Sequence, residues 1–139
     1  MGTHLETRLH IDSWDEKPYR ELPDGSKFTR AEVRLTGTGD GFEGEGTWDA
    51  LMYYAPDGNA AYLGLMQLTG RLDGRDGSFV LQGSGAFDGG QAAGDSSVVA
   101  GSGTGDLTGL RGTARSVSTH ADYPHMPLTL DYDLAEPSR

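Results

Sequence analysis

The sequence predicts an all-β protein, an eight-stranded antiparallel meander closed into a small barrel. Two observations predict this fold class. Apolar and polar residues alternate over many short segments, as in strands that bury one face. Glycine supplies 22 of the 139 residues, in clusters within and between these segments, where it is typical of bulges, bends and turns. No segment has the period of an amphipathic helix, and closure of the sheet would cover its edges.

The first half of the chain contains four predicted strands. Residues 3–13 alternate between an apolar and a charged face, and residues 27–36 do so again. Between them lies a predicted loop with Pro and Asp at 15–26, and 12–20 is the one stretch with room for a helical turn. Two longer strands, 42–55 and 60–72, flank a turn of composition Pro-Asp-Gly-Asn.

The second half completes the predicted meander. Further strands are expected at 78–87, 91–100, 112–119 and 127–134, joined mostly by glycine-rich turns. We expect one domain over residues 1–139, with residues 135–139 frayed.

Composition excludes several function classes. The chain has 21 acidic and 11 basic residues, a net charge of −10, which argues against nucleic acid or an anionic membrane as partner. No apolar run approaches the about 18 residues of a membrane span, and the first residues lack a hydrophobic signal core, so a cytoplasmic protein is expected. The absence of cysteine excludes disulfides, thiolate catalysis and cysteine-ligated metals.

The sequence does not match the common catalytic and cofactor-binding motifs. No glycine precedes lysine, so there is no phosphate-binding loop, and the dinucleotide fingerprint that starts at Gly101 ends in Asp106. Ser96 follows Gly94 by two residues but has Val98 where a nucleophile elbow needs glycine. The sequence predicts no cofactor.

One histidine pair is a candidate metal site. His120 and His125 flank Asp122, and these three could converge on a metal ion. A solvated loop is the commoner explanation for such residues, so the sequence predicts no metal.

Acidic residues of the third strand are candidates for chemistry. Glu43, Glu45 and Asp49 share one face by the period of two, while Trp48 and Met52 share the other. Glu45 and Asp49 would lie roughly 13 Å apart, too far for a close carboxylate pair. Glu45 is the candidate acid/base or charge stabiliser, and a solvated outer face is the alternative.

Residues 48–54 and 60–68 are apolar on both faces. Such strands need cover on both sides. An interior pocket, in which small glycines leave room, would supply one cover, and a homo-oligomer interface would supply the other. A packed core is the alternative to a pocket. Gln82, a polar residue in an apolar strand, would either orient a ligand carbonyl or satisfy its backbone neighbours. The predicted ligand-binding wall consists of Trp48, Met52, Tyr54, Tyr62 and Met66.

Four segments together resemble a known family: SWDEKPY at 13–19, GSFVLQGSGAFDGG at 77–90, GSGTGDLTGLRG at 101–112 and LDYDL at 130–134. They are similar to a bacterial family of uncharacterised small proteins whose folds are calycin-like barrels, like that of allene oxide cyclase. The resemblance runs from about residue 3 to residue 134 and implies a closed antiparallel barrel.

For function the resemblance implies less. Allene oxide cyclases enclose a hydrophobic, oxygenated fatty-acid derivative and steer its ring closure without a cofactor. By this analogy we expect a hydrophobic small-molecule ligand and a cofactor-independent cyclase or isomerase of natural-product metabolism, with Glu45 and Gln82 as catalytic residues. Family members often carry an acid at the position of Met66, a histidine at that of Gly83 and an aromatic near Ser96, so this pocket is expected to be more apolar. The alternatives are a non-catalytic carrier or sensor and an oligomeric scaffold without a ligand.

Overall fold

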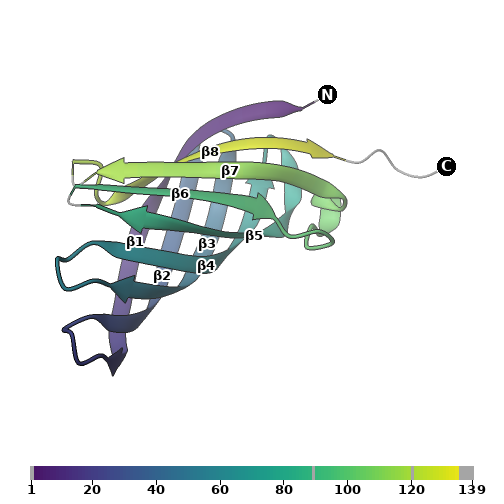
Figure 1. The fold of residues 1–139 in the computed structure, drawn as a ribbon. Coiled ribbons are helices and arrows are strands. Elements are labelled where there is room, and N and C mark those ends of the chain that lie inside the picture. The colour runs from purple at the N-terminus through teal and green to yellow at the C-terminus, as the bar shows by residue number, and fades with distance from the viewer. Residues whose placement is uncertain (1, 89, 120, 135–139) are drawn as a thin grey trace.

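The computed structural model describes residues 2–88, 90–119 and 121–134. It is a closed barrel of eight strands, each antiparallel to the next in the chain, with β8 returning to β1 (Figure 1). The predicted fold class is therefore confirmed, whereas residues 135–139 lie outside the described part. The strands are β1 (Thr3–Glu21), β2 (Lys27–Gly39), β3 (Phe42–Tyr54), β4 (Ala60–Leu72), β5 (Arg75–Phe87), β6 (Gln91–Val98), β7 (Leu110–Thr119) and β8 (His125–Leu134), and a 3₁₀ turn, η1 (Gly105–Leu107), precedes β7.

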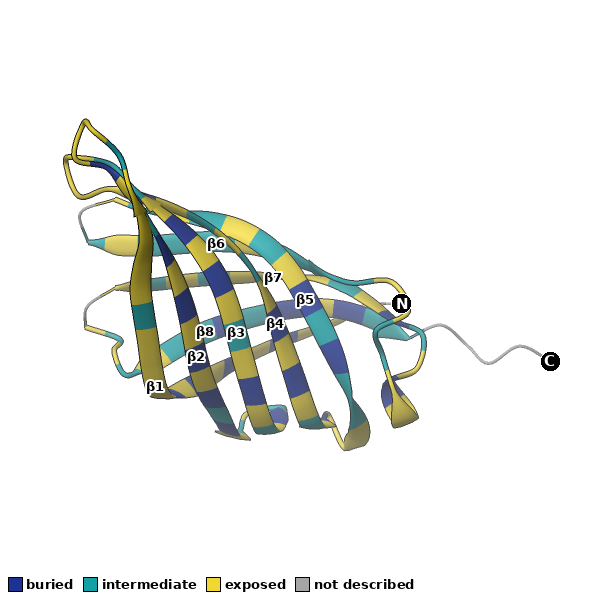
Figure 2. Cartoon of the chain, turned by 90° about the horizontal axis from the view of Figure 1, so that it is seen from below, coloured by how far each residue is buried: buried dark blue, intermediate teal, exposed yellow. Residues whose placement is uncertain are grey.

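Alternate residues of each strand face the interior, as the banding of buried and exposed positions in Figure 2 shows. The register of β3 with β4 is continuous from Phe42 opposite Leu72 to Tyr54 opposite Ala60. This register places Trp48 beside Met66 on the inner face. The inner and outer faces of the central strands are therefore defined without ambiguity.

The two ends of the barrel differ. At the end formed by the β2–β3, β4–β5 and β6–β7 connections, η1 lies against β5 and inserts Leu107, which is 1% exposed. Buried Tyr132 donates a hydrogen bond to Asp73 in the β4–β5 turn at the same end. This closed end holds most of the tightly packed core, including Phe79, Leu68 and Leu72. The opposite, open end is formed by the other four connections.

The structure corrects the prediction for residues 12–26. β1 continues to Glu21, so 12–20 contains no helical turn and the loop shrinks to residues 22–26. The extended backbone follows from antiparallel pairing with β2, which runs to Glu21 opposite Lys27. The register shifts at Asp12 and again at Tyr19. Beyond His10, β1 pairs only with β2, because the pairing with β8 ends there.

The outer face of β3 and β4 exposes large apolar side chains. Leu63 is 58% exposed and lies opposite Leu51, which is also exposed. Leu65 and Tyr53 continue this surface. The predicted homo-oligomer interface would lie here, and it stays a prediction. Within the described residues, no helix has the length and apolarity needed to cross a membrane.

Candidate functional site

A pocket of about 430 Å³ occupies the open half of the barrel. Side chains from β1, β3, β4, β5, β6, β7 and β8 contribute to its wall. The five residues predicted as a ligand-binding wall all line it: Trp48, Met52, Tyr54, Tyr62 and Met66. The sequence left open whether the interior is a ligand pocket or a packed core. The interior is packed at one end of the barrel and contains a pocket at the other.

Aromatic rings line one side of the pocket. Trp14 contacts Trp48 edge to face, with ring centroids 5.8 Å apart, and Trp48 contacts Tyr62 in the same way at 5.5 Å. Such T-shaped pairs are favoured by the quadrupoles of the rings. They produce a continuous aromatic surface across β1, β3 and β4.

Inner glycines make room for these rings. A Cβ atom at Gly64 would lie 2.8 Å from Nε1 of Trp48, and one at Gly85 would lie 2.5 Å from the hydroxyl of Tyr62. The sequence predicts that interior glycines leave space for a ligand. At these two positions that expectation is wrong, because the protein's own rings fill the space.

Small and polar side chains form the facing wall. Ala92 and Ser96 on β6 and Ser116 and Ser118 on β7 line the pocket. Ser116 donates a 2.6 Å hydrogen bond to the backbone carbonyl of Pro127. The pocket therefore has an aromatic side and a narrow hydroxyl-bearing side.

A carboxylate that the sequence analysis did not single out lies behind the aromatic wall. Glu16, half-buried on the inner face of β1, accepts three hydrogen bonds. Its Oε2 accepts from Tyr54 at 2.6 Å and from buried Thr29 at 2.7 Å, and its Oε1 accepts from Nε1 of Trp14 at 2.9 Å. This network joins an ionisable carboxylate to Trp14 and Tyr54 of the pocket wall. Asp95, which also borders the pocket, is instead paired with Arg115 at 2.9 Å.

The same contacts determine the protonation states. Burial alone would raise the pKa of Glu16, but the hydrogen bonds from Tyr54, Thr29 and Trp14, aided by the charge of Lys27, lower this pKa below its usual range. Burial, followed by the bond to Glu16 and its charge, raises the pKa of Tyr54. At neutral pH, Glu16 is thus an anion and Tyr54 a neutral phenol.

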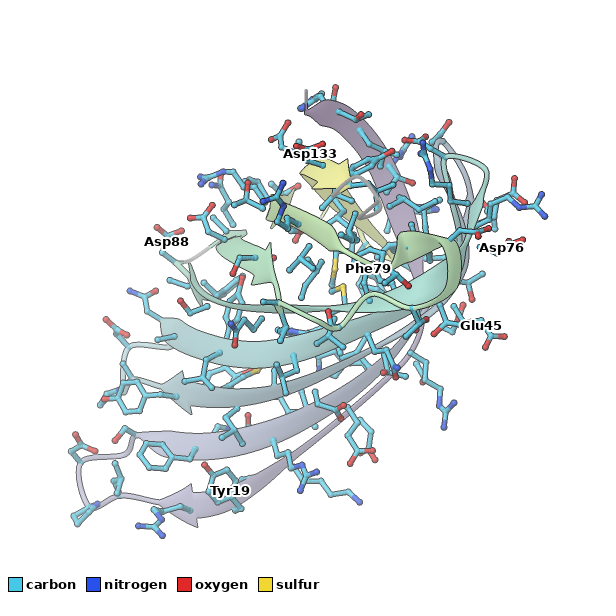
Figure 3. The ribbon with its side chains drawn as sticks, turned by 90° about the vertical axis from the view of Figure 1, so that its right-hand side faces the viewer. Tyr19, Glu45, Asp76, Phe79, Asp88 and Asp133 are labelled. Carbon is cyan, nitrogen blue, oxygen red and sulfur yellow. The ribbon has the colours of Figure 1, made fainter. Side chains whose placement is uncertain are left out.

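The two predicted catalytic residues lie outside the barrel. Glu45 is exposed between Thr36 and Thr69 of the neighbouring strands and points away from the interior, where Phe79 lies (Figure 3). Gln82 is exposed opposite Leu65 on the outer face. Neither side chain lines the pocket. The physical reason is the alternation of the strand, because Glu45 and the inward Trp48 are an odd number of residues apart.

Two of the three residues considered as metal ligands, Asp122 and His125, make local contacts. His120 lies outside the described residues. Asp122 is engaged locally, since its Oδ2 accepts a 2.8 Å hydrogen bond from the backbone of Thr119. His125 stacks edge to face on His10, with centroids 5.6 Å apart. The described part of the chain contains no group of three or more His, Cys, Asp or Glu side chains placed to hold a metal.

These observations define a class: small antiparallel β-barrels that are closed at one end and hold an apolar interior pocket at the other. Within that class, the chain belongs to the DUF3224 family, described as proteins of unknown function, whose model matches residues 6–132. The chain is also similar to the crystal structure of a DUF3224 protein of unknown function from Shewanella oneidensis MR-1. The TM-score is 0.76 at 25% identity, over 98% of this chain and 100% of that one. Among curated proteins, none matches this chain.

Proposed function

We propose that this protein binds a hydrophobic small molecule in the pocket at the open end of the barrel. One observation carries the proposal: a cavity of about 430 Å³ with apolar rings and methionines along one side. This volume falls in the range typical of small-molecule sites. The closed end already provides a packed core, so the pocket is space that folding of the barrel leaves unfilled.

The placement of the acidic residues favours binding over the catalysis first expected. Catalysis by Glu45 requires that side chain inside the barrel, and it lies outside, together with exposed Asp49. Trp48 and Met52 face inward instead. Binding by a carrier or sensor requires this apolar wall and does not depend on Glu45 or Asp49, so it is the leading proposal.

The neutral fluorescent probe N-phenyl-1-naphthylamine tests binding. Its emission is expected to rise when it enters the pocket, with energy transfer from Trp14 and Trp48, both in the wall. Ala92→Phe, which fills the pocket, is expected to weaken binding at least tenfold. Ala93→Phe is the matched control, because Ala93 is not part of the pocket wall. The absence of an emission increase with the unmodified protein, or equal weakening by both substitutions, would contradict the proposal.

A cofactor-independent cyclase or isomerase is the second candidate, favoured by the contact between Tyr54 and Glu16. An isomerase could use this pair as a relay, in which Tyr54 takes a proton from a carbon next to a carbonyl as its own proton passes to Glu16. The same proton then returns to another carbon of the substrate, so the balance needs no further reactant. The likeness to allene oxide cyclases and a place in natural-product metabolism stay predictions.

Conversion of 3-cyclohexen-1-one to its conjugated isomer tests this candidate by ultraviolet absorbance. If the relay operates, the protein should isomerise 3-cyclohexen-1-one faster than buffer alone does, and Glu16→Gln should abolish this acceleration. Glu45→Gln should leave the rate unchanged, because Glu45 is exposed on the outer face. A rate equal to buffer for the unmodified protein leaves binding as the function.

A further inference from the structure

We infer that Tyr54, held by Glu16, is a hydrogen-bond acceptor that anchors an uncharged, ring-bearing ligand through a hydroxyl or N–H group, and that the pocket rejects carboxylates. This inference rests on the proposed binding function and adds the chemical class of the ligand. It also gives a role to Glu16, which lies behind the wall rather than in it.

The direction of the hydrogen bond makes Tyr54 an acceptor. An ionised carboxylate has no proton to give, so the phenol must donate in the 2.6 Å contact between Tyr54 and Glu16. With its only proton committed to Glu16, the phenol oxygen has only lone pairs left to offer. Tyr54 itself lines the pocket, so these lone pairs are available to a ligand donor there.

Glu16 is fixed in this role by its other contacts. Thr29 donates from a buried position on β2, and Trp14 donates to the second carboxylate oxygen. A carboxylate held by three donors keeps its charge and orientation when a ligand binds. Polarisation along the Tyr54–Glu16 bond also strengthens the phenol oxygen as an acceptor.

The charge of the site decides against anionic ligands. Over the described residues, the pocket wall contains Asp95 and His125 but no lysine or arginine. Arg115 is paired with Asp95, and Lys27, with Nζ 5.2 Å from the centre of the Tyr54 ring, is exposed, outside the wall, and acts on Glu16. A carboxylate ligand would therefore meet the anions of Glu16 and Asp95 without a lysine or arginine in the wall to compensate it.

The shape of the wall indicates rings. Trp14, Trp48 and Tyr62 offer an aromatic surface on one side, and the serines of β6 and β7 lie on the other. A flat ring system can stack on the first surface while its polar edge reaches hydroxyl groups.

Three matched probes test the inference by calorimetry: 2-naphthol, which donates a hydrogen bond, 2-methoxynaphthalene, which cannot, and 2-naphthoate, which is an anion. We expect 2-naphthol to bind about tenfold more tightly than the methyl ether, as for one hydrogen bond to a charge-supported acceptor. We expect 2-naphthoate to bind most weakly.

Two pairs of variants locate the effect. Tyr54→Phe should remove the preference for 2-naphthol and leave the affinity for the methyl ether unchanged, whereas Tyr53→Phe on the outer face should alter neither. Glu16→Gln should reduce the preference and strengthen binding of 2-naphthoate, whereas Glu45→Gln should not. Circular dichroism of each variant confirms that the barrel is folded.

The outcomes distinguish failure of the Tyr54 inference from failure of the proposed binding function. If N-phenyl-1-naphthylamine and all three probes fail to bind, the proposed function and the inference both fall. If only the three probes fail to bind, the inference alone is overturned. If the probes bind in competition with N-phenyl-1-naphthylamine but show no preference for 2-naphthol, only the inference is overturned. Tighter binding of 2-naphthoate that Lys27→Met abolishes would also overturn it, because Lys27 would then be the anchor.

Discussion

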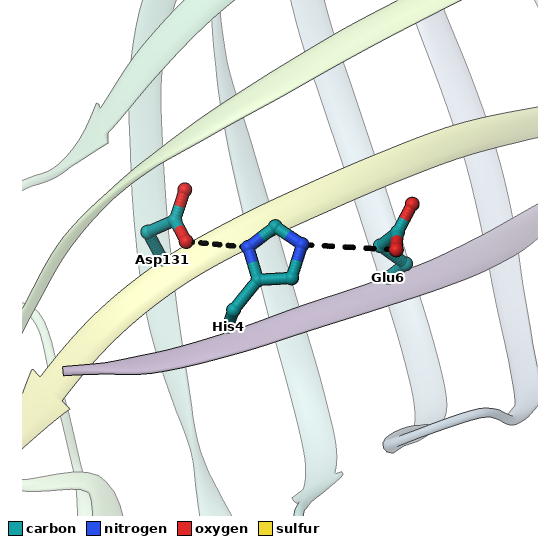
Figure 4. A network of polar contacts seen from close by, with 3 residues as sticks. All are labelled: His4, Glu6 and Asp131. Carbon is teal, nitrogen blue, oxygen red and sulfur yellow. Dashed lines mark hydrogen bonds and ion pairs between the residues drawn. The ribbon is translucent and has the colours of Figure 1, made fainter.

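His4 lies on the outer face of the barrel, where β1 and β8 meet, with a carboxylate on each side of its ring (Figure 4). Its Nδ1 is 2.6 Å from Oδ1 of Asp131, and its Nε2 is 3.7 Å from Oε2 of Glu6. The hydrogen bond to Asp131 and the charge of that residue, with a smaller contribution from Glu6, raise the pKa of His4 above its usual value of 6.5. The imidazolium form is therefore favoured by folding.

This pairing predicts a pH dependence. Because the pKa is raised on folding, the stabilisation is complete below pH 6.5 and is lost as the pH rises through the folded-state pKa. Asp131→Asn should move the His4 pKa down in an NMR titration. Asp133→Asn serves as the control, since Asp133 pairs with Arg111 instead. An unchanged His4 titration in Asp131→Asn would contradict this account.

Glu16 and Glu45 show what sequence reasoning could and could not assign at single positions. The five wall residues were predicted because Trp48, Met52 and Tyr54 keep the period of two along β3, as do Tyr62 and Met66 along β4. The same period excludes Glu45 from the interior once Trp48 is placed inside. Glu16 was missed because the register shift near Asp12 interrupts the alternation that leads to it. The remaining signal for an inward-facing Glu16 is its place two residues after Trp14 and two before Pro18, at alternate positions of a strand.

At the scale of elements, β1 differs from the other strands. Thr3–Arg8 pair only with β8, and only Leu9 and His10 pair on both sides. The second half of β1 pairs only with β2, so one row of backbone groups faces away from the sheet. Pro18 in this half lacks an N–H group, and Lys17 is exposed, two features that protect sheet edges from pairing with other chains.

The two-sided pairing at Leu9 and His10 predicts uneven hydrogen exchange along β1. Amides in 13–21 should exchange faster than those of Leu9 and His10, because about half of them lack a strand partner and local opening there breaks fewer contacts. Deuterium exchange followed by NMR measures this difference. Equal protection of Leu9, His10 and residues 13–21 would indicate that another element or another copy covers the edge.

The prediction of elements failed at this same strand. Alternation and turn composition together predicted all eight strands, because most strands place apolar residues at every second position and glycine-rich turns separate the others. Pro18 and the charged residues around it read as a loop. Pairing with β2, which is distant in the sequence, keeps this segment extended. The local sequence does not indicate that pairing.

At the scale of the whole molecule, packing is concentrated at the closed end and space at the open end. Leu68 and Met66 are two residues apart on the inner face of β4, but Leu68 is 1% exposed in the packed core and Met66 lines the pocket. Truncation in a packed core leaves a new cavity, whereas truncation at a pocket wall enlarges an existing one.

The unequal ends predict unequal costs of mutation. Leu68→Ala should lower the free energy of unfolding by about 3–4 kcal/mol and Met66→Ala by about 2 kcal/mol or less, measured by equilibrium denaturation in urea. Similar values for the two variants would mean that the space near Met66 is closed in solution. Binding of N-phenyl-1-naphthylamine should respond to Met66→Ala and not to Leu68→Ala.

The closed end, with η1 and Tyr132 sealing it, has a consequence for how such a chain can diverge. The most tightly packed side chains lie at the closed end, so selection for folding and selection for a ligand act on partly separate sets of positions. We expect substitutions along the pocket wall to cost less stability than substitutions at the closed end. A barrel of this design is therefore a starting point for changing ligand preference in the laboratory.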